Sequence, residues 1–415
     1  MKRLLHLLPA MAAALLTCGF VPSVSPGLEE HGRACADFSK TPEQRIAECD
    51  LALRYSPMAP QMQAMLMQNL GIAQRQKGDV DQAFATFQAV IALEPDAWQP
   101  YVTRGEIYLN REQTDAALAD FEHALSIKPD FAQAHYDRGM ALARRSRYDG
   151  ALAELGTAIA LDPKQSGYVA ARGSVLLQQG QYARAIEDFD AALAQKPDEP
   201  WMLTDRGAAY AGLRQYDRAT ADFDRAGALA PEAPGPHRAR ANMYRKQNAL
   251  EPALAEADKA VKLKPDDAES YNARGNVYGV MENHTAATDD FSEAIRLAPG
   301  RAAAYNNRCF ERAKTGRDLD DALADCNKSL ALKPGEANCL DSRAFVHFRQ
   351  GDLKSAMADY DAALARDPAL AASLYMRGLM KRKAGDTAAG DADIAAAKTV
   401  ESGIAERFAG YGVTP

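Results

Sequence analysis

The chain has 415 residues, more than one globular core usually takes, so its length predicts either several domains or a repeat array. Hydrophobic residues make up 47% and aromatic residues only 7%, a balance that favours helices packed through small side chains over large sheets. The net charge is −7, and basic residues are scattered among acidic ones, which excludes the electrostatic footprint of a nucleic-acid-binding protein.

The N-terminus is organised like a secretory signal peptide. Two basic residues precede an apolar run over 4–21, and small residues follow it. We therefore expect residues 1–25 to be removed on export of a bacterial-type protein to the periplasm, which leaves no membrane span. Two alternatives stay open: an uncleaved anchor helix, and lipid attachment at Cys18, although Thr17 stands where such sites normally have Gly, Ala or Ser.

Residues 26–63 are expected to form an N-terminal helical cap. Thr41 and Gln44 have the spacing of a capping box, with a proline at the first helical position, so a helix is predicted to begin there. Cys49 lies two turns into that helix, and Cys35 precedes it. We expect a Cys35–Cys49 disulfide that contributes about 3 kcal/mol. The alternative is two small buried residues.

Prolines recur along the following chain at an almost fixed interval of 34 residues, with one interval of 35. They are Pro95, Pro129, Pro163, Pro197, Pro231, Pro265, Pro299, Pro334 and Pro368. This period is typical of a solenoid of helix-turn-helix repeats. We assign ten repeats to residues 64–397 and number each so that its terminal proline is position 32. The repeats begin at Ala64, Trp98, Ala132, Ser166, Pro200, Pro234, Ala268, Ala302, Ala337 and Ala371.

Several positions keep one side-chain size throughout the repeats. Position 8 is always small, as at Gly207, and position 20 is Ala or Gly, as at Ala219. Position 24 is bulky in eight repeats, as at Phe223, and position 11 is often Tyr. Two helices can cross closely where each offers a small residue. The pattern of small residue, Tyr, Ala, Phe and Pro resembles the tetratricopeptide repeat.

This resemblance implies an all-α fold, a right-handed superhelical solenoid of helix pairs, and a role in protein–protein interaction. One departure from the family is that position 7, usually Leu, is Arg in every repeat after the first, as at Arg206. Position 23 is Asp or Glu in the same repeats, as at Asp222, and Thr86 in the first. We therefore expect an ion pair between the two helices of a repeat. A stripe of arginines that binds phosphate or carboxylate is the alternative.

The eighth repeat departs from the family at two positions together. Cys309 occupies the small position 8 and Cys326 the bulky position 24, and the resemblance implies that these positions lie close to each other. We expect a Cys309–Cys326 disulfide in place of the usual contact. Cys339 is then left over, and a Cys326–Cys339 bond is the competing pairing.

The sequence contains no recognisable catalytic or metal-binding motif. The seven histidines are dispersed, without a pair at i, i+4 spacing, and the cysteines lack zinc-ligand spacing. Phosphate-binding loops and a nucleophile elbow are also missing. We therefore predict a protein that is not an enzyme and that has no metal and no cofactor.

The family resemblance implies a concave groove lined by positions 2, 5, 9, 12 and 13 of the first helix of each repeat. Polar and aromatic residues at or near these positions suit a peptide, because amides and arginines bind backbone or carboxylate while aromatic faces take side chains. The candidates are Arg238, Asn242, Arg245, Lys246, Asn272, Asn276, Asn306, Phe310, Phe345 and Phe348. An ordinary solvated inner surface is the alternative.

A carboxylate clamp of the chaperone-binding type is disfavoured. Members of the family with such a clamp carry two asparagines and three basic residues at fixed positions. Asn276 and Asn307 match the asparagines, whereas Asn272, Asn338 and Ser342 stand where the basic residues belong.

Residues 398–415 are expected to form a C-terminal capping helix. We predict a scaffold or adaptor of the cell envelope that binds a protein or peptide partner and no nucleic acid. The alternative is a regulatory or substrate-binding subunit of an envelope machine for outer-membrane protein assembly or polysaccharide export.

Overall fold

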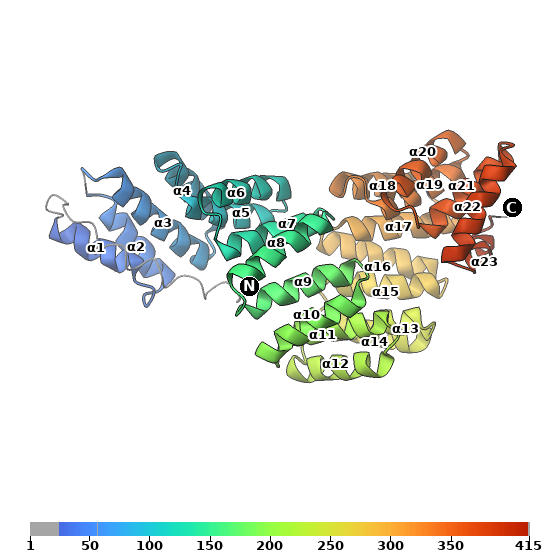
Figure 1. Cartoon of the computed structure of the whole chain (residues 1–415), viewed down its shortest axis with the longest axis horizontal. Coiled ribbons are helices and arrows are strands. Elements are labelled where there is room, and N and C mark those ends of the chain that lie inside the picture. Colours follow the sequence, from blue (N-terminus) through green and yellow to red (C-terminus); the bar gives the residue numbers. More distant parts are fainter. Residues whose placement is uncertain (1–24, 56, 414–415) are drawn as a thin grey trace. The chain divides into compact units, whose positions relative to one another are not determined.

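The computed structural model describes residues 25–55 and 57–413. Residues 1–24, which hold nearly all of the expected signal peptide and Cys18, lie outside this range. Within it the regular structure is helical, and no strand occurs. The chain divides into two compact bodies, an N-terminal body up to Val175 and a C-terminal body from Leu176. Figure 1 shows the helices in chain order.

The N-terminal body begins with a cap of two helices, which are α1 (Pro26–Ala36) and α2 (Pro42–Ala52). Antiparallel pairs follow: α3 (Pro60–Lys77) with α4 (Val80–Leu93), α5 (Trp98–Asn110) with α6 (Thr114–Ile127), and α7 (Ala132–Arg144) with α8 (Tyr148–Leu161). The division falls within α9 (Ser166–Gln178). α3 begins four residues before the expected start of the first repeat, because Pro60 opens the helix and nothing interrupts it.

The C-terminal body continues the same alternation of the first helix of a repeat, called helix A, and its second helix, called helix B (Figure 1). Its helices are α10 (Tyr182–Gln195), α11 (Pro200–Gly212), α12 (Tyr216–Leu229), α13 (Gly235–Lys246), α14 (Leu250–Leu263), α15 (Ala268–Val280), α16 (His284–Leu297), α17 (Ala302–Thr315), α18 (Leu319–Leu332), α19 (Ala337–Gln350), α20 (Leu353–Arg366), α21 (Ala371–Lys383), α22 (Thr387–Val400) and α23 (Ile404–Gly410). Each expected repeat therefore contains one helix pair.

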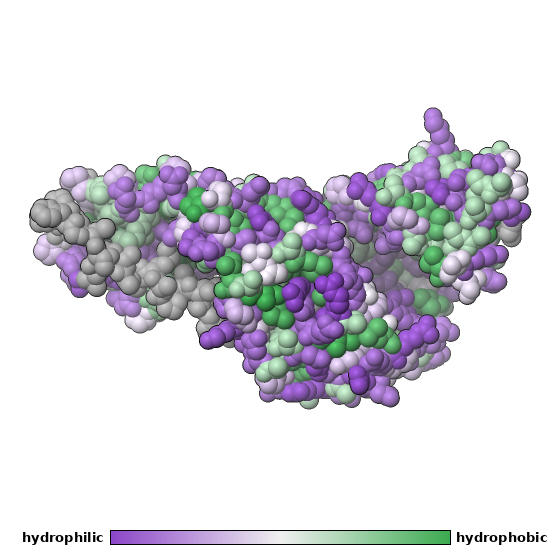
Figure 2. All heavy atoms as spheres, viewed as in Figure 1, coloured by the Kyte–Doolittle hydropathy of each residue, from purple (hydrophilic) through white to green (hydrophobic). Residues whose placement is uncertain are grey.

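Residue size determines how closely the two helices of a pair approach. A Cβ added at Gly207 would lie 2.6 Å from Cε1 of Phe223, so only glycine fits against that ring. Ala219 and Phe223 are both fully buried. Each pair turns at position 15, whose backbone is left-handed even where it is not glycine, as at Arg214 with φ of 61°. The core is thus a series of small-against-large contacts, and Figure 2 shows hydrophilic side chains spread over the visible surface of each body.

Candidate functional site

Most of the position-7 arginines form the expected ion pairs within repeats. Arg206 donates from Nε and Nη2 to both carboxylate oxygens of Asp222, at 2.8 and 2.7 Å. The hydrogen bonds to Asp222 raise the pKa of Arg206 and keep it charged. The same two-bond pairing occurs at Arg104–Asp120, Arg274–Asp290, Arg308–Asp325, Arg343–Asp359 and Arg377–Asp393. Arg138 makes a single hydrogen bond to Glu154. These guanidiniums are engaged by the protein itself, which argues against a ligand-binding stripe.

The sixth repeat differs from this arrangement. Arg240 donates to Asp224 of the preceding helix B, while the buried Glu256 bonds to His237 and Lys259. The pair expected between Arg240 and Glu256 is therefore replaced. His237 reaches Glu256 because glutamate is one methylene longer than the usual aspartate. The third repeat shows the same relation, since His135 bonds to Glu154 at 2.7 Å.

Two predicted groove residues of the seventh repeat, Asn272 and Asn276, belong to a cluster of amides with Asn307 of the eighth repeat, which is not one of the predicted groove residues. Nδ2 of Asn307 donates to Oδ1 of Asn272 at 2.9 Å and to Oδ1 of Asn276 at 3.2 Å. All three side chains are half-buried, on α15 and α17. Their contacts leave amide groups at the surface that can bind a peptide backbone.

The predicted basic groove residues of α13 are divided among different contacts. Arg238 pairs with Asp267, which caps α15. Arg245 donates to the exposed Asn242 at 2.8 Å, and burial lowers the pKa of Arg245. Lys246 is exposed. These residues do not form one site with the amide cluster through any contact of the described residues.

The predicted aromatic wall of the groove is largely covered. Phe345 is 1% exposed, so its expected place on an open surface is wrong. The cause is α23, whose Phe408 packs edge-on against Phe345, with ring centroids 5.7 Å apart. Phe348 stacks beside Phe345, while Phe310 remains partly exposed and touches Tyr411. The C-terminal segment therefore does more than cap α22, because it reaches back to α17 and α19.

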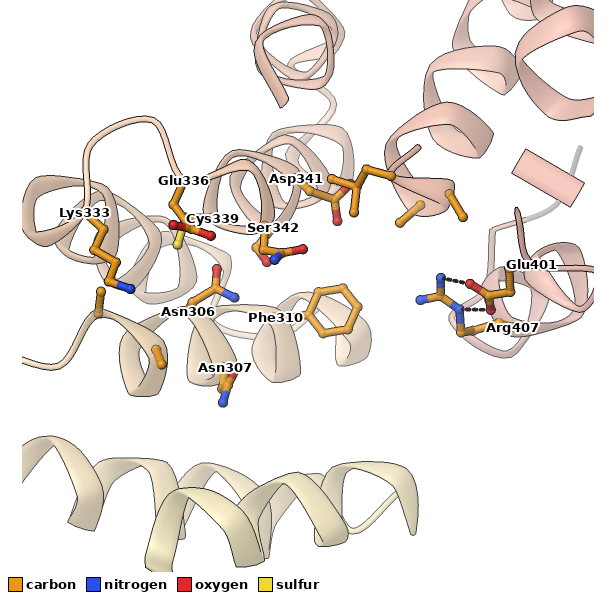
Figure 3. A pocket seen from close by; sticks show the side chains of 16 residues that line it. Asn306, Asn307, Phe310, Lys333, Glu336, Cys339, Asp341, Ser342, Glu401 and Arg407 are labelled. Atoms are coloured by element: carbon orange, nitrogen blue, oxygen red, sulfur yellow. Dashed lines mark hydrogen bonds and ion pairs between the residues drawn. The ribbon is translucent and has the colours of Figure 1, made fainter. Parts of the chain in front are cut away.

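A cavity of about 520 Å³ lies beside this aromatic cluster. Helices α17, α19 and α21 line it together with the C-terminal segment (Figure 3). Asn306, Asn307 and Phe310 come from α17, and Asp341 and Ser342 from α19. Because Asn307 also belongs to the amide cluster, the cluster and the cavity are continuous.

The charged side chains that line the cavity differ in whether they bond to a partner of opposite charge. Asp341 is 9% exposed and accepts a hydrogen bond of 2.5 Å from Ser373. Burial raises the pKa of Asp341 to about 6, while Ser373 and the charge of Arg407 oppose the shift. Arg407 binds both oxygens of Glu401, at 2.8 and 2.9 Å. Asn306 Oδ1 is buried without a hydrogen-bond donor.

Sequence reasoning missed two of these groups. Asp341 stands at position 5 of its repeat, which is a groove position, so the sequence carried a signal for it. Arg407 lies beyond the repeats, where no period indicates which residues meet.

The N-terminal body has a buried polar network of its own. Arg75 pairs with Glu106, and Asp137 accepts a bond of 3.0 Å from Gln133. Burial and the nearby Glu106 raise the pKa of Asp137 well above its usual range. None of the predicted groove residues belongs to this network.

The part of the chain that the structure describes contains two disulfides, and both are pairings expected from the sequence. Cys35 is bonded to Cys49, which joins α1 to α2, and Cys309 to Cys326, which joins α17 to α18. Cys339 is a buried thiol 3.0 Å from Ser329 Oγ, so the competing pairing with Cys326 is absent. Over the described ranges we find neither a group of three metal-ligating side chains nor a helix long and apolar enough to span a membrane.

Family comparisons agree with the helix pairs. Models described as tetratricopeptide repeat match residues 70–136, 136–200, 170–234 and 268–301, and a model described as TPR repeat matches residues 241–280. Together they cover more than half of the chain. The chain belongs to the tetratricopeptide repeat family. A comparison with curated proteins found no match.

Solved structures share the tetratricopeptide fold with this chain. The APC/C hetero-tetramer Cut9–Hcn1 matches with a TM-score of 0.52 and 11% identity, over 89% of this chain and 84% of that one. A tetratricopeptide repeat protein from Parabacteroides merdae matches with a TM-score of 0.47 and 16% identity, over 60% of this chain and 98% of that one. MamA matches with a TM-score of 0.37 and 23% identity, over 41% of this chain and 92% of that one. At 11% identity the likeness to Cut9–Hcn1 shows the fold alone.

Proposed function

We propose that this tetratricopeptide repeat chain is a non-catalytic scaffold, exported to the periplasm, which binds an extended segment of a protein partner along the A helices of repeats 6–9. The observation that carries the proposal is the position of Asn307. Its side chain bonds to Asn272 and Asn276 and also lines the cavity of about 520 Å³. A peptide could therefore use the amides for its backbone and the cavity for a side chain.

Export is supported by the N-terminal sequence and by the cysteines. Disulfides persist in oxidising compartments and are rare in the cytosol. Four of the six cysteines are paired here, in the cap and in the eighth repeat.

Photocrosslinking in intact cells tests the proposal. A photoreactive residue at Asn276 is expected to capture one dominant protein, whereas the same residue at the exposed Asp289 on helix B of that repeat is expected to capture little. Mass spectrometry of the recovered chain also gives its mature N-terminus and any lipid at Cys18.

Three outcomes would decide against parts of this proposal. Equal capture at Asn276 and Asp289, or capture at neither, would refute binding along the A helices. An unprocessed N-terminus with reduced cysteines would refute export. Capture of several subunits of one outer-membrane or polysaccharide-export machine would favour a regulatory or substrate-binding subunit over an independent adaptor.

A further inference from the structure

We propose that the cavity between α17, α19, α21 and the C-terminal segment binds a cationic side chain, the guanidinium of Arg or the ammonium of Lys, of a partner peptide. This inference rests on the proposed function, since it names the chemistry that the peptide must carry. The argument depends on which charges of the cavity are already paired and which are not.

Three acidic residues line the cavity, Glu336, Asp341 and Glu401, and Asp341 on α19 is the one that is buried. Its side chain is 9% exposed, and its one hydrogen-bond partner among the described residues is the hydroxyl of Ser373. A hydroxyl donates one bond but brings no opposite charge. A buried carboxylate without a counter-ion is costly unless it is neutralised or paired.

Arg407 is the basic residue of the cavity whose charge acts on Asp341, but its guanidinium already pairs with another carboxylate. Its Nε and Nη2 donate to the two oxygens of Glu401 in a bidentate pair, drawn in Figure 3. Such a pair satisfies the charge and geometry of the guanidinium. Lys333 also lines the cavity, but its side chain is exposed to solvent. Asp341 is therefore the charge that a ligand could still neutralise.

Neutral groups of the cavity suit a cation as well. Asn306 Oδ1 is a buried acceptor without a donor, which an N–H of the ligand would satisfy. The ring of Phe310 is partly exposed, and it already attracts one cation, since Nζ of Lys314 lies 5.5 Å from its centroid. Figure 3 shows the side chains of Asn306, Ser342, Asp341 and Phe310 around one space.

The size and energetics of the site agree with this ligand. The volume of about 520 Å³ exceeds that of one long side chain, so part of the peptide backbone can enter too. Burial raises the pKa of Asp341 to about 6, which means that its charged form is disfavoured in the free protein. A bound cation removes that cost, and a carboxylate with a strongly raised pKa in a cavity is typical of functional sites.

Calorimetric titration of the full disulfide-bonded chain with blocked tripeptides tests the inference. The probes are acetyl-Gly-Arg-Gly-amide and acetyl-Gly-Lys-Gly-amide, with the Gln and Glu tripeptides as neutral and acidic comparisons. For one side chain we expect a Kd on the order of 1 mM for the cationic probes and at least roughly tenfold weaker binding of the others.

Two variants locate the binding. Asp341→Asn keeps an acceptor for Ser373 but removes the charge, and it is expected to weaken binding of the Arg tripeptide about tenfold. Asp266→Asn removes the same charge from an exposed carboxylate that does not line the cavity, and it is expected to leave affinity unchanged. Melting curves of both variants show whether they are folded.

No binding of the cationic probes, preference for the Glu probe, or equal weakening by the two variants would overturn the inference. These results are distinguishable from failure of the proposed function. If crosslinking at Asn276 still captures a partner while the probes fail, the scaffold role stands and only the cationic specificity falls.

Discussion

Arg206 donates two parallel hydrogen bonds to Asp222 on the other helix of its repeat, and a third to Asp190 in the preceding repeat. The position-7 arginine therefore joins two repeats as well as two helices. Arg274 makes the corresponding contacts with Asp290 and Asp258. Such contacts between neighbours add to the interface energy on which the stability of a repeat array depends.

Replacing Arg206 by methionine should reduce stability without affecting the partner site. Asp222 is 7% exposed, so the change leaves an unpaired buried carboxylate, and we expect a loss of about 3 kcal/mol. Arg225→Met is the matched control, because Arg225 pairs with Asp198 at the surface and should lose less than about 1 kcal/mol. Urea unfolding measures both, and crosslinking at Asn276 should remain. Equal losses, or loss of the crosslink, would contradict the structural role.

Two glycines of the fifth repeat should respond to alanine in opposite directions. A Cβ at Gly207 would lie 2.6 Å from the Phe223 ring and 3.1 Å from the Ala219 carbonyl, so Gly207→Ala should destabilise by about 1–3 kcal/mol. Gly227 lies within α12 with nothing within 4 Å, so Gly227→Ala should stabilise by about 0.5–1 kcal/mol. Thermal unfolding gives both values, and a shift of the same sign in both variants would refute the packing argument.

The repeat architecture could be predicted because it rests on local, periodic rules. Three features recur often enough to align the copies: a proline after helix B in nine of the ten repeats, a small residue at position 8, and a bulky residue at position 24. Once aligned, Arg206 with Asp222 and Cys309 with Cys326 could be recognised as partners. Each of these pairs lies within one repeat, where the resemblance fixes the geometry.

The site was harder to predict because it depends on contacts between repeats and beyond them. Phe345 occupies a regular position of α19, but its burial is caused by Phe408, which follows the last repeat. Residues 404–413 have no period that indicates where they fold back. The replacement of Arg240 by His237 as the partner of Glu256 does not follow from the residue types at these positions, because Glu154 of the third repeat bonds to both His135 and Arg138.

Removal of the Cys309–Cys326 disulfide should loosen the eighth repeat. Serine at both positions is expected to cost about 3 kcal/mol, and hydrogen exchange of α17 and α18 should become faster. The matched variant Cys309→Gly with Cys326→Phe restores the residue types of Gly275 and Phe291 in the preceding repeat, and it should recover most of the protection. If the amide hydrogens of α17 and α18 exchange equally fast in the two double variants, the disulfide does not replace that packing contact.

Asp341→Asn should stabilise the protein near neutral pH and have little effect in acid. The folded-state pKa is raised from 3.8 to about 6, so the folded protein binds a proton that the unfolded chain has released. The contribution of Asp341 to the stability of the natural protein therefore falls as pH rises from about 4 to 6, by up to about 3 kcal/mol. Arg407 opposes this shift, and Tyr360 is the other titratable group that interacts with Asp341.

Urea unfolding of the natural protein and Asp341→Asn at pH 4, 6 and 7.5 measures the effect, with values of pH chosen to span that window. The difference between the two proteins should grow with pH, which isolates Asp341 from other carboxylates. Parallel stability curves would show that Asp341 does not titrate with a raised pKa.

Phe408→Ala should open the C-terminal repeats while leaving the rest of the array folded. Phe408 is 1% exposed, and its ring lies 5.7 Å from Phe345 and 5.4 Å from Tyr375 between centroids. The loss of that buried ring should cost about 3–5 kcal/mol locally. Because each repeat contacts mainly its neighbours, faster hydrogen exchange is expected in α19, α21 and α23 but not in α11 and α12. Val400→Ala is the control, since Val400 is 55% exposed and should change little. Unchanged exchange in Phe408→Ala would mean that α23 does not hold the aromatic cluster closed, and the Phe345 ring would then have to be covered by α19 and α21 alone.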